Sequence, residues 1–349
     1  MNYRLLGRSG LRVSEMALGT MTFGEDWGWG ASAADARKIY DAFRDAGGNF
    51  IDTANVYTNG SSERFVGEFV KGHRGEVVLA TKYTNASLDP AHPPRDPNAG
   101  GNARKNMVQA VEASLKRLGT DYIDLYWLHI WDGGLTPVEE VMRGFDDLVR
   151  AGKILYAGIS DTPAWWVAQA NMLADLRGWT RFVGLQIEYS LAERTVEREL
   201  VPMAKALGLG VTAWGALGGG VLSGKYRRGE GAGGRYSKEE MKQHMPDAVR
   251  TDRIVDVLDS VAREVERPPA QVALAWLQTR PVPVIPILGA RRLEQLEDNL
   301  ASLTLSLSRA HVARLDEASA IEPGFPGSMY GREMVNRLVH AGMRDRLLT

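Results

Sequence analysis

Short apolar runs alternate with longer amphipathic stretches along this chain. The short runs are rich in Val, Ile and Leu and are apolar on both faces, which is typical of parallel strands buried on both sides. Eight such strands are predicted, near Met16–Leu18, Phe50–Asp52, Val77–Thr81, Ile123–Leu128, Leu155–Ile159, Val183–Ile187, Gly210–Trp214 and Val284–Ile287.

The stretches between these strands repeat apolar residues at spacings of three and four, which predicts helices that pack one face on a core. Several also carry start and stop signals, such as Pro137 in a first turn and Gly152 just past an end. Helices are expected at Ala33–Ala46, Ser62–Val70, Asn106–Leu118, Pro137–Arg150, Thr162–Leu176, Val196–Leu207, Asp252–Glu266, Ala270–Thr279 and Leu293–Leu300.

Strand–helix units repeated in this way predict an α/β fold, a closed (β/α)₈ TIM barrel. The alternative is an open doubly wound sheet, which would normally place a G-x-G-x-x-G turn after its first strand. The glycines 218–220 lack that spacing and come late in the chain. No linker divides the chain, so residues 1–349 are expected to form a single domain, with an appended C-terminal tail from about residue 322.

Two long segments interrupt the regular alternation of strands and helices. Tyr83–Gly101 is rich in proline, and Gly215–Arg250 is rich in glycine and charged residues, with a short helix expected at Lys238–His244. Both follow predicted strands, so both are expected on the C-terminal face of a barrel, where barrel enzymes carry their active sites.

Composition narrows the possible partners and chemistry. The 349 residues include 42 basic and 43 acidic ones, so no strong field is available to attract nucleic acid or an anionic membrane. There is no cysteine, which excludes disulfides, thiol nucleophiles and cysteine-ligated metals. We find neither a signal peptide nor an apolar run of about 18 residues that could span a bilayer. A cytoplasmic protein is expected.

Four polar residues stand at or just after the ends of predicted strands: Asp52, Tyr57, Lys82 and His129. Each has an ordinary structural interpretation, as a helix cap, a loop packing residue, a lysine reaching to solvent or a buried histidine. Together they follow the second, third and fourth strands, so a barrel would bring them to one sector of its C-terminal rim.

These four residue types support one specific chemistry. A tyrosine hydroxyl is a poor acid at neutral pH, but a neighbouring ammonium group lowers its pKa by favouring the phenolate. A carboxylate can keep that lysine charged, and a neutral histidine can donate a hydrogen bond to a carbonyl oxygen. Such a site protonates and stabilises the oxygen of a C=O group that receives a hydride, and it contains no hydrolytic nucleophile.

The motifs around these residues resemble the aldo-keto reductase family. The pattern D-T-A-x-x-Y at Asp52–Tyr57, the lysine ending Leu79–Lys82 and the histidine ending Asp124–His129 match that family's catalytic tetrad. The similarity runs from Gly7–Ser14, which matches the family's N-terminal β-hairpin, to Asn299 and somewhat beyond. It implies that the tyrosine protonates a small-molecule carbonyl substrate and that NADPH supplies the hydride.

The resemblance also implies a site for the nicotinamide. Ser160 and Asp161 match the pair that holds its carboxamide, although Asp161 replaces the commoner asparagine and is acceptor-only when ionised. Gln186 matches a glutamine that reaches the same carboxamide. Trp214 takes the place of a tyrosine that stacks on the ring, and Gly215 replaces a usual serine, which leaves one phosphate hydrogen bond in question.

The glycine-rich segment after the seventh strand is matched to a loop over the cofactor's pyrophosphate. Leu217, Gly219 and Lys225 are the residues concerned. A flexible connection without a binding role is the alternative interpretation of these glycines.

The segment Gly289–Asn299 follows the eighth strand and opens a helix, whose N-terminal N–H groups can receive a phosphate. The resemblance assigns Gly289 and Arg291 to the adenosine 2′-phosphate end, and Gln295 and Asn299 to the adenine edge. Because NADH has no 2′-phosphate, Arg291 favours NADPH.

Aromatic residues on the rim are the candidates for a substrate pocket: Trp27, Trp29, Tyr83 and Trp131. They suit an apolar or sugar-like carbonyl compound, or they pack against one another. The sequence names neither the substrate nor the oligomeric state.

Two other classes of function remain as alternatives. One is a nucleotide-binding sensor with little turnover, because fold alone does not imply catalysis. The other is a metal-dependent barrel enzyme, for which Asp52 and His129 are too few ligands. We therefore expect no metal.

Overall fold

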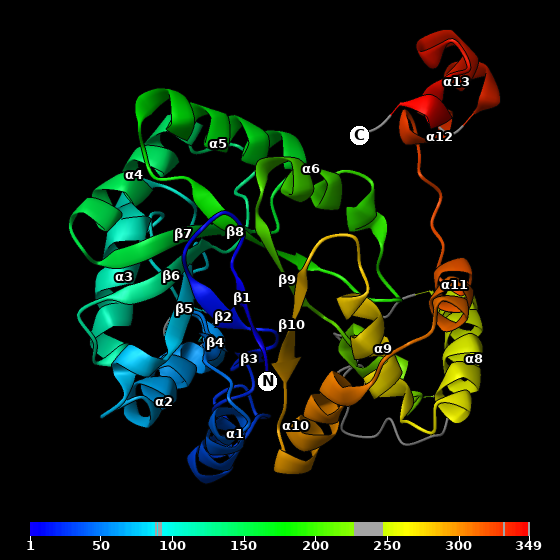
Figure 1. Ribbon diagram of the computed structural model, residues 1–349. Helices are drawn as coiled ribbons and strands as arrows, with labels where there is room; N and C mark the ends of the chain where they lie inside the picture. The colour runs from blue at the N-terminus through cyan, green and yellow to red at the C-terminus, as the bar shows by residue number, and fades with distance from the viewer. Residues whose placement is uncertain (88, 90–92, 227–246, 331, 348–349) are drawn as a thin grey trace.

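The computed structural model describes residues 1–87, 89, 93–226, 247–330 and 332–347. Eight parallel strands close into a barrel in the order β10-β3-β4-β5-β6-β7-β8-β9 (Figure 1). They are β3 Ala17–Gly19, β4 Phe50–Asp52, β5 Val78–Tyr83, β6 Ile123–Leu128, β7 Ile154–Ser160, β8 Phe182–Glu188, β9 Gly210–Trp214 and β10 Val284–Gly289. The predicted (β/α)₈ barrel and its eight strands are confirmed.

Helices surround the barrel, and those between strands lie within a few residues of their predicted positions. They are α1 Ala33–Asp45, α2 Ser61–Phe69, α3 Arg104–Leu118, α4 Val138–Arg150, α5 Ala164–Arg177, α6 Leu200–Leu207, α8 Ala248–Glu264, α9 Pro269–Gln278, α10 Leu293–Leu300 and α11 Arg309–Ala318. The short helix expected at Lys238–His244 lies outside the described residues.

One helix begins later than its pattern predicts. A helix was expected from Val196, but α6 begins at Leu200 and a 3₁₀ turn, Thr195–Glu197, precedes it. Pro202 explains the difference, because proline is tolerated in the first turn of a helix and disrupts its interior.

An antiparallel hairpin of β1 (Tyr3–Leu5) and β2 (Arg12–Ser14) precedes the barrel, as the resemblance implied. Apolar residues from the hairpin and from the barrel interior form one buried cluster. Its members are Leu6, Val13, Ala17, Phe50, Val78, Ala80, Leu125, Trp127 and Ile285. Because Ala17, Phe50 and Val78 begin their strands, the hairpin closes the N-terminal end of the barrel and leaves the other end for ligands.

Trp127 is the largest side chain in this inner cluster and is fully buried. A Cβ atom on Gly158 would overlap its ring, and one on Gly184 would come within 2.9 Å of it. Glycine is therefore required at these two neighbouring strand positions because the indole occupies the space of their side chains.

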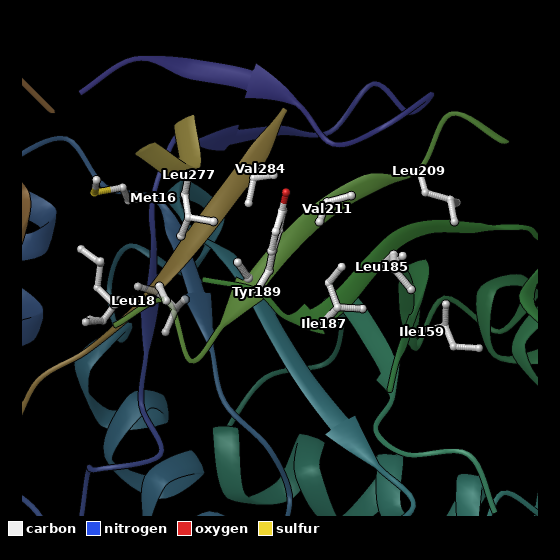
Figure 2. Packing of buried hydrophobic residues seen from close by; sticks show 14 of the residues in the cluster. Met16, Leu18, Ile159, Leu185, Ile187, Tyr189, Leu209, Val211, Leu277 and Val284 are labelled. Carbon is white, nitrogen blue, oxygen red and sulfur yellow. The ribbon is translucent and has the colours of Figure 1, made fainter. Parts of the chain in front are cut away.

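A second, larger cluster lies between the strands and the surrounding helices. Figure 2 shows part of it, with Leu18, Leu185 and Val211 from three strands and Leu277 from α9 among its members. This layer holds the helices on the barrel and fixes the strand ends that carry the site.

The C-terminal tail contains two short helices, α12 (Gly327–Tyr330) and α13 (Glu333–His340). In Figure 1 they lie apart from the barrel, beyond α11. Large apolar side chains of the tail are exposed, including Phe325 at 84% and Leu338 at 75%. Among the helices within the described ranges, none is both long and apolar enough to cross a membrane.

Candidate active site

Three of the four predicted polar residues are joined by hydrogen bonds at the C-terminal rim of the barrel. Lys82 Nζ, on β5, donates to Asp52 Oδ2 at the end of β4 over 2.5 Å and to the Thr53 carbonyl over 2.9 Å. It also lies 3.2 Å from the hydroxyl of Tyr57, in the turn that follows β4. Lys82 is fully buried, so these three oxygens take the place of water around its ammonium group.

The protonation states in this group follow from burial and from the neighbouring charges. Burial raises the pKa of Tyr57 above its usual value, and Lys82 opposes that shift without overcoming it. The expectation of a lowered tyrosine pKa is therefore wrong in its net direction. Burial alone would lower the pKa of Lys82, but Asp52 and Tyr57 outweigh burial and raise it. At neutral pH the site holds an ammonium group beside a protonated phenol.

His129 follows β6 and completes the group. Its ring meets the Tyr57 ring edge-on, with 5.9 Å between the centroids and 80° between the planes. Burial, aided by the charge of Lys82, holds the pKa of His129 well below its usual value, so the imidazole is neutral.

Asn85 is a residue of the site that sequence reasoning missed. Its Nδ2 atom lies 3.2 Å from His129 Nδ1. An amide nitrogen only donates, so Nδ1 accepts and the proton of the neutral ring is on Nε2. The available signal was position, because Asn85 stands three residues after Lys82 in the same rim loop.

The residues matched to the nicotinamide site lie next to this group. Gln186 Nε2 donates to Asp52 Oδ1 over 3.1 Å, which leaves its oxygen and its second N–H for a ligand. The Ser160 hydroxyl is buried without a hydrogen-bond partner among the described residues. Trp214 Nε1 donates to Asp161 Oδ1 over 3.1 Å. Burial raises the pKa of Asp161 to about 6, although this hydrogen bond acts in the opposite direction.

Basic side chains gather where the cofactor phosphates are expected. The pKa of Lys225 is lowered, first by burial and then by the positive charges of Arg291 and Arg292. A Cβ atom on Gly220 would lie 2.5 Å from Lys225 Nζ, so the absence of a side chain there makes room for the ammonium group. Arg292 was not among the predicted residues. An anionic ligand would relieve the repulsion of Lys225 by the two arginines.

The remaining predicted cofactor residues occupy the segments around these cations. Leu217 and Gly219 lie at the start of the 3₁₀ turn Gly218–Ser223, and Gly289 ends β10 with open space around it. Gln295 Oε1 accepts from the backbone N–H groups of Arg291 and Arg292, so its oxygen is used to cap α10. Asn299 is buried on the same helix.

The predicted pocket aromatics divide into two groups. Trp27 and Trp29 contact each other at 5.8 Å, and Trp27 Nε1 donates to Asn59 Oδ1, two residues from Tyr57. Trp131 meets Trp165 edge-on at 5.9 Å. These tryptophans are at least partly exposed, and Trp165 was not predicted.

Tyr83 does not line the pocket, and this prediction is corrected. It is fully buried, stacks on Tyr126 at 5.4 Å and contacts Phe145 of α4. The physical reason is strand geometry. β5 continues through Tyr83, and successive side chains on a strand point to opposite faces, so Tyr83 faces the helices while Lys82 faces the barrel.

The described part of the chain contains no group of three or more acidic or histidine side chains that could hold a metal ion. A closed parallel barrel with this lysine, carboxylate, tyrosine and histidine at adjacent strand ends defines a class, the barrel oxidoreductases that act on carbonyl groups. The aldo/keto reductase family model matches residues 15–320, and the chain belongs to this family.

Curated relatives agree with this class. A norsolorinic acid reductase of Aspergillus flavus is 39% identical, over 93% of this chain and 82% of that protein. Norsolorinic acid reductase B of Dothistroma septosporum is 38% identical, over 93% and 83%. An aryl-alcohol dehydrogenase [NADP(+)] of Phanerodontia chrysosporium is 37% identical, over 97% and 91%. The protein is an oxidoreductase, and carbonyl reduction is its class of reaction.

Proposed function

We propose that this protein reduces an aldehyde or ketone reversibly to an alcohol with NADPH, and that Tyr57 is the general acid. One observation carries the proposal: the Lys82 ammonium group lies 3.2 Å from the Tyr57 hydroxyl and 2.5 Å from Asp52. A charged lysine in this position stabilises the phenolate that remains after proton transfer, which lowers the barrier to that transfer.

Each residue of the tetrad has a distinct task in this proposal. The Tyr57 hydroxyl gives its proton to the carbonyl oxygen, and Asp52 keeps Lys82 charged. The Nε2–H of His129 donates a hydrogen bond to the same oxygen, which stabilises negative charge as it develops there. NADPH, when bound, supplies the hydride that the carbonyl carbon receives.

The dinucleotide would be held along the rim from β7 to α10. Ser160, with its unpartnered hydroxyl, and Gln186 would bind the carboxamide, and Trp214 would carry the ring. Leu217, Gly219 and Lys225 would cover the pyrophosphate, which the clustered cations support. Arg291 would pair with the 2′-phosphate, while Gly289, Gln295 and Asn299 would line the adenosine end. The name of the relative from P. chrysosporium includes NADP(+), which supports this choice.

The substrate would be an aryl carbonyl compound. Trp27, Trp29 and Trp131 offer partly exposed aromatic surface on the rim loops, and flat aromatic rings stack well on indoles. Two of the relatives are named for norsolorinic acid and one for an aryl alcohol, which favours this class.

The test is Tyr57→Phe, which removes one oxygen and keeps the ring. Turnover of an aryl aldehyde such as nitrobenzaldehyde should fall by about 10²–10⁴-fold, the usual contribution of a general acid. The Kd for NADPH should change by less than about twofold, because the ring still fills its place. NADPH consumption and fluorescence titration measure the two quantities.

Tyr330→Phe is a matched control, because Tyr330 is 61% exposed in the tail. It should leave both quantities unchanged. Near wild-type turnover by Tyr57→Phe would refute the acid assignment. If the wild-type protein binds NADPH tightly but reduces no member of a broad carbonyl panel, the sensor function holds instead.

A further inference from the structure

Asp161 is an acidic residue held in a constrained position directly after β7. Its backbone has φ = 41°, in the left-handed region, where Asn and Asp are the residues best tolerated after glycine. The hydrogen bond from Trp214 Nε1 fixes its carboxylate beside the indole. Both side chains border a cavity of about 390 Å³, which Ile187 and Glu188 also line. The carboxylate and the proposed nicotinamide-stacking ring therefore form one unit.

The charge of this carboxylate is not matched by a neighbouring cation. No ion pair joins Asp161 to a basic residue within the ranges that the structure describes. The attraction of Lys82 reaches it, but the Lys82 ammonium group is bonded to Asp52, Thr53 and Tyr57. A largely buried carboxylate without a paired cation is costly, and a cationic ligand would offset that cost.

The other ionisable groups around Asp161 do not supply that cation. Tyr57 is neutral at physiological pH because burial raises its pKa. Glu188 of β8 and Glu193 of the following loop line the same cavity and are acidic. Glu193 accepts a hydrogen bond from the backbone N–H of Thr195, so it is oriented toward its own loop.

We propose that the Asp161 carboxylate selects the redox state of the bound nucleotide, favouring NADP⁺ over NADPH and thereby biasing the bound equilibrium toward carbonyl reduction. The inference rests on the proposed function, because it needs a nicotinamide ring beside Trp214. The two forms of the ring differ by one positive charge. An ionised carboxylate distinguishes them by electrostatics, whereas a neutral amide at this position would not.

The direct test compares wild-type protein with Asp161→Asn at about pH 8. Asparagine keeps the size, tolerates the left-handed backbone and retains an oxygen that accepts from Trp214, so charge is the property removed. We expect the ratio of Kd for NADP⁺ to Kd for NADPH to rise by about tenfold or more. Tenfold corresponds to about 30 mV for a two-electron couple. Fluorescence or calorimetric titration of the two nucleotides measures it without turnover.

Glu193→Gln is the matched control, since it removes a charge from the same cavity. Its ratio of Kd for NADP⁺ to Kd for NADPH should stay within about twofold of the wild-type ratio. An unchanged ratio in Asp161→Asn, with both nucleotides still bound, overturns the inference and leaves the proposed function intact. Failure of the wild-type protein to bind either nucleotide overturns both.

Proton release provides a second, independent readout. By linkage, a ligand that favours the carboxylate form lowers the pKa of Asp161, so NADP⁺ binding at about pH 6 should release protons from this group. Calorimetry in two buffers with different ionisation heats counts these protons. Protons released from the 2′-phosphate of the nucleotide should be equally many in both proteins, so they cancel in the comparison. We expect clearly more protons from wild type than from Asp161→Asn, and equal release would contradict the proposal.

Discussion

Two carboxylates near one another in this site have opposite electrostatic surroundings. Asp52 accepts hydrogen bonds from Lys82 and Gln186, so its charge is compensated. Asp161 accepts a hydrogen bond from the indole of Trp214 but has no paired lysine or arginine within the described residues, and burial raises its pKa to about 6. The same chemical group thus contacts a lysine at one position and lacks a paired cation at the other.

Because folding raises the pKa of Asp161, the free energy of unfolding depends on pH through this residue. A carboxyl whose pKa rises from 3.8 to about 6 on folding stabilises the native state below about pH 4, and that contribution is lost as pH rises through about 6. Asp161→Asn should therefore be more stable than the free wild-type protein by about 1–3 kcal/mol near pH 8. The advantage should shrink toward about pH 4.

Urea unfolding of both proteins across this pH range measures the effect. A difference in unfolding free energy that stays constant from about pH 4 to about pH 8 would show that Asp161 does not titrate as described. Nucleotide must be absent, because a bound NADP⁺ would compensate the charge.

At the residue level, sequence reasoning could predict which side chains meet but not their net electrostatics. Asp52 ends β4 and Lys82 is the last residue but one of the adjacent β5, so the topology brings them together. Whether the pKa of Tyr57 is raised or lowered depends on how completely its surroundings exclude water, and sequence spacing does not encode that. Asn85 was missed for a related reason, because its contact with His129 depends on the path of an irregular loop.

At the level of elements, the strands were the most predictable feature. Parallel strands buried on both faces leave continuous apolar runs, so all eight were located from the sequence. Strand ends were less certain. β5 extends one residue further than the polar Lys82 suggested, and this single residue moves Tyr83 from the expected pocket to the core.

The contact of Trp127 with glycine predicts an element-level effect. Gly158→Ala would force a methyl group into the indole ring and should reduce the free energy of unfolding by about 1–3 kcal/mol. In a Trp127→Phe background the smaller ring leaves space, so the additional cost of Gly158→Ala should be smaller. Urea unfolding of the wild type, the two single variants and the double variant gives the coupling energy between positions 158 and 127.

Gly75→Ala serves as a comparison, because nothing lies within 4 Å of the added Cβ atom there. It should change stability by less than about 0.5 kcal/mol, as for other surface substitutions. If the losses of unfolding free energy for Gly158→Ala and Trp127→Phe simply add in the double variant, the added methyl group does not contact the Trp127 ring.

For the whole molecule, α11 and the tail beyond it differ sharply in how they are attached. Arg194 bonds to Glu197, to the Ser319 hydroxyl and to the Asp316 carbonyl, which ties α11 to the loop after β8. The tail helices that follow have no fully buried side chain. We therefore expect the stability of the barrel to depend on the attachment of α11 and not on the tail helices.

Removal of residues 323–349 should change the free energy of unfolding of the barrel by less than about 1 kcal/mol, since it uncovers little apolar surface. Arg194→Ala, in contrast, should cost about 2 kcal/mol or more because it leaves buried acceptors unpaired. Thermal and urea unfolding of both variants test this contrast. A large loss on truncation would mean that the tail packs on the barrel in solution.

The hairpin that closes the barrel floor has a practical consequence for handling the protein. Met1 packs against the buried core beside this closure, whereas the tail stands clear of the body. A dye, a surface linker or a fusion partner joined through the tail would disturb neither the N-terminal end of the barrel, which the hairpin closes, nor the C-terminal end, which binds ligands. The same cargo joined at Met1 would press on the β1–β2 pair that seals the barrel.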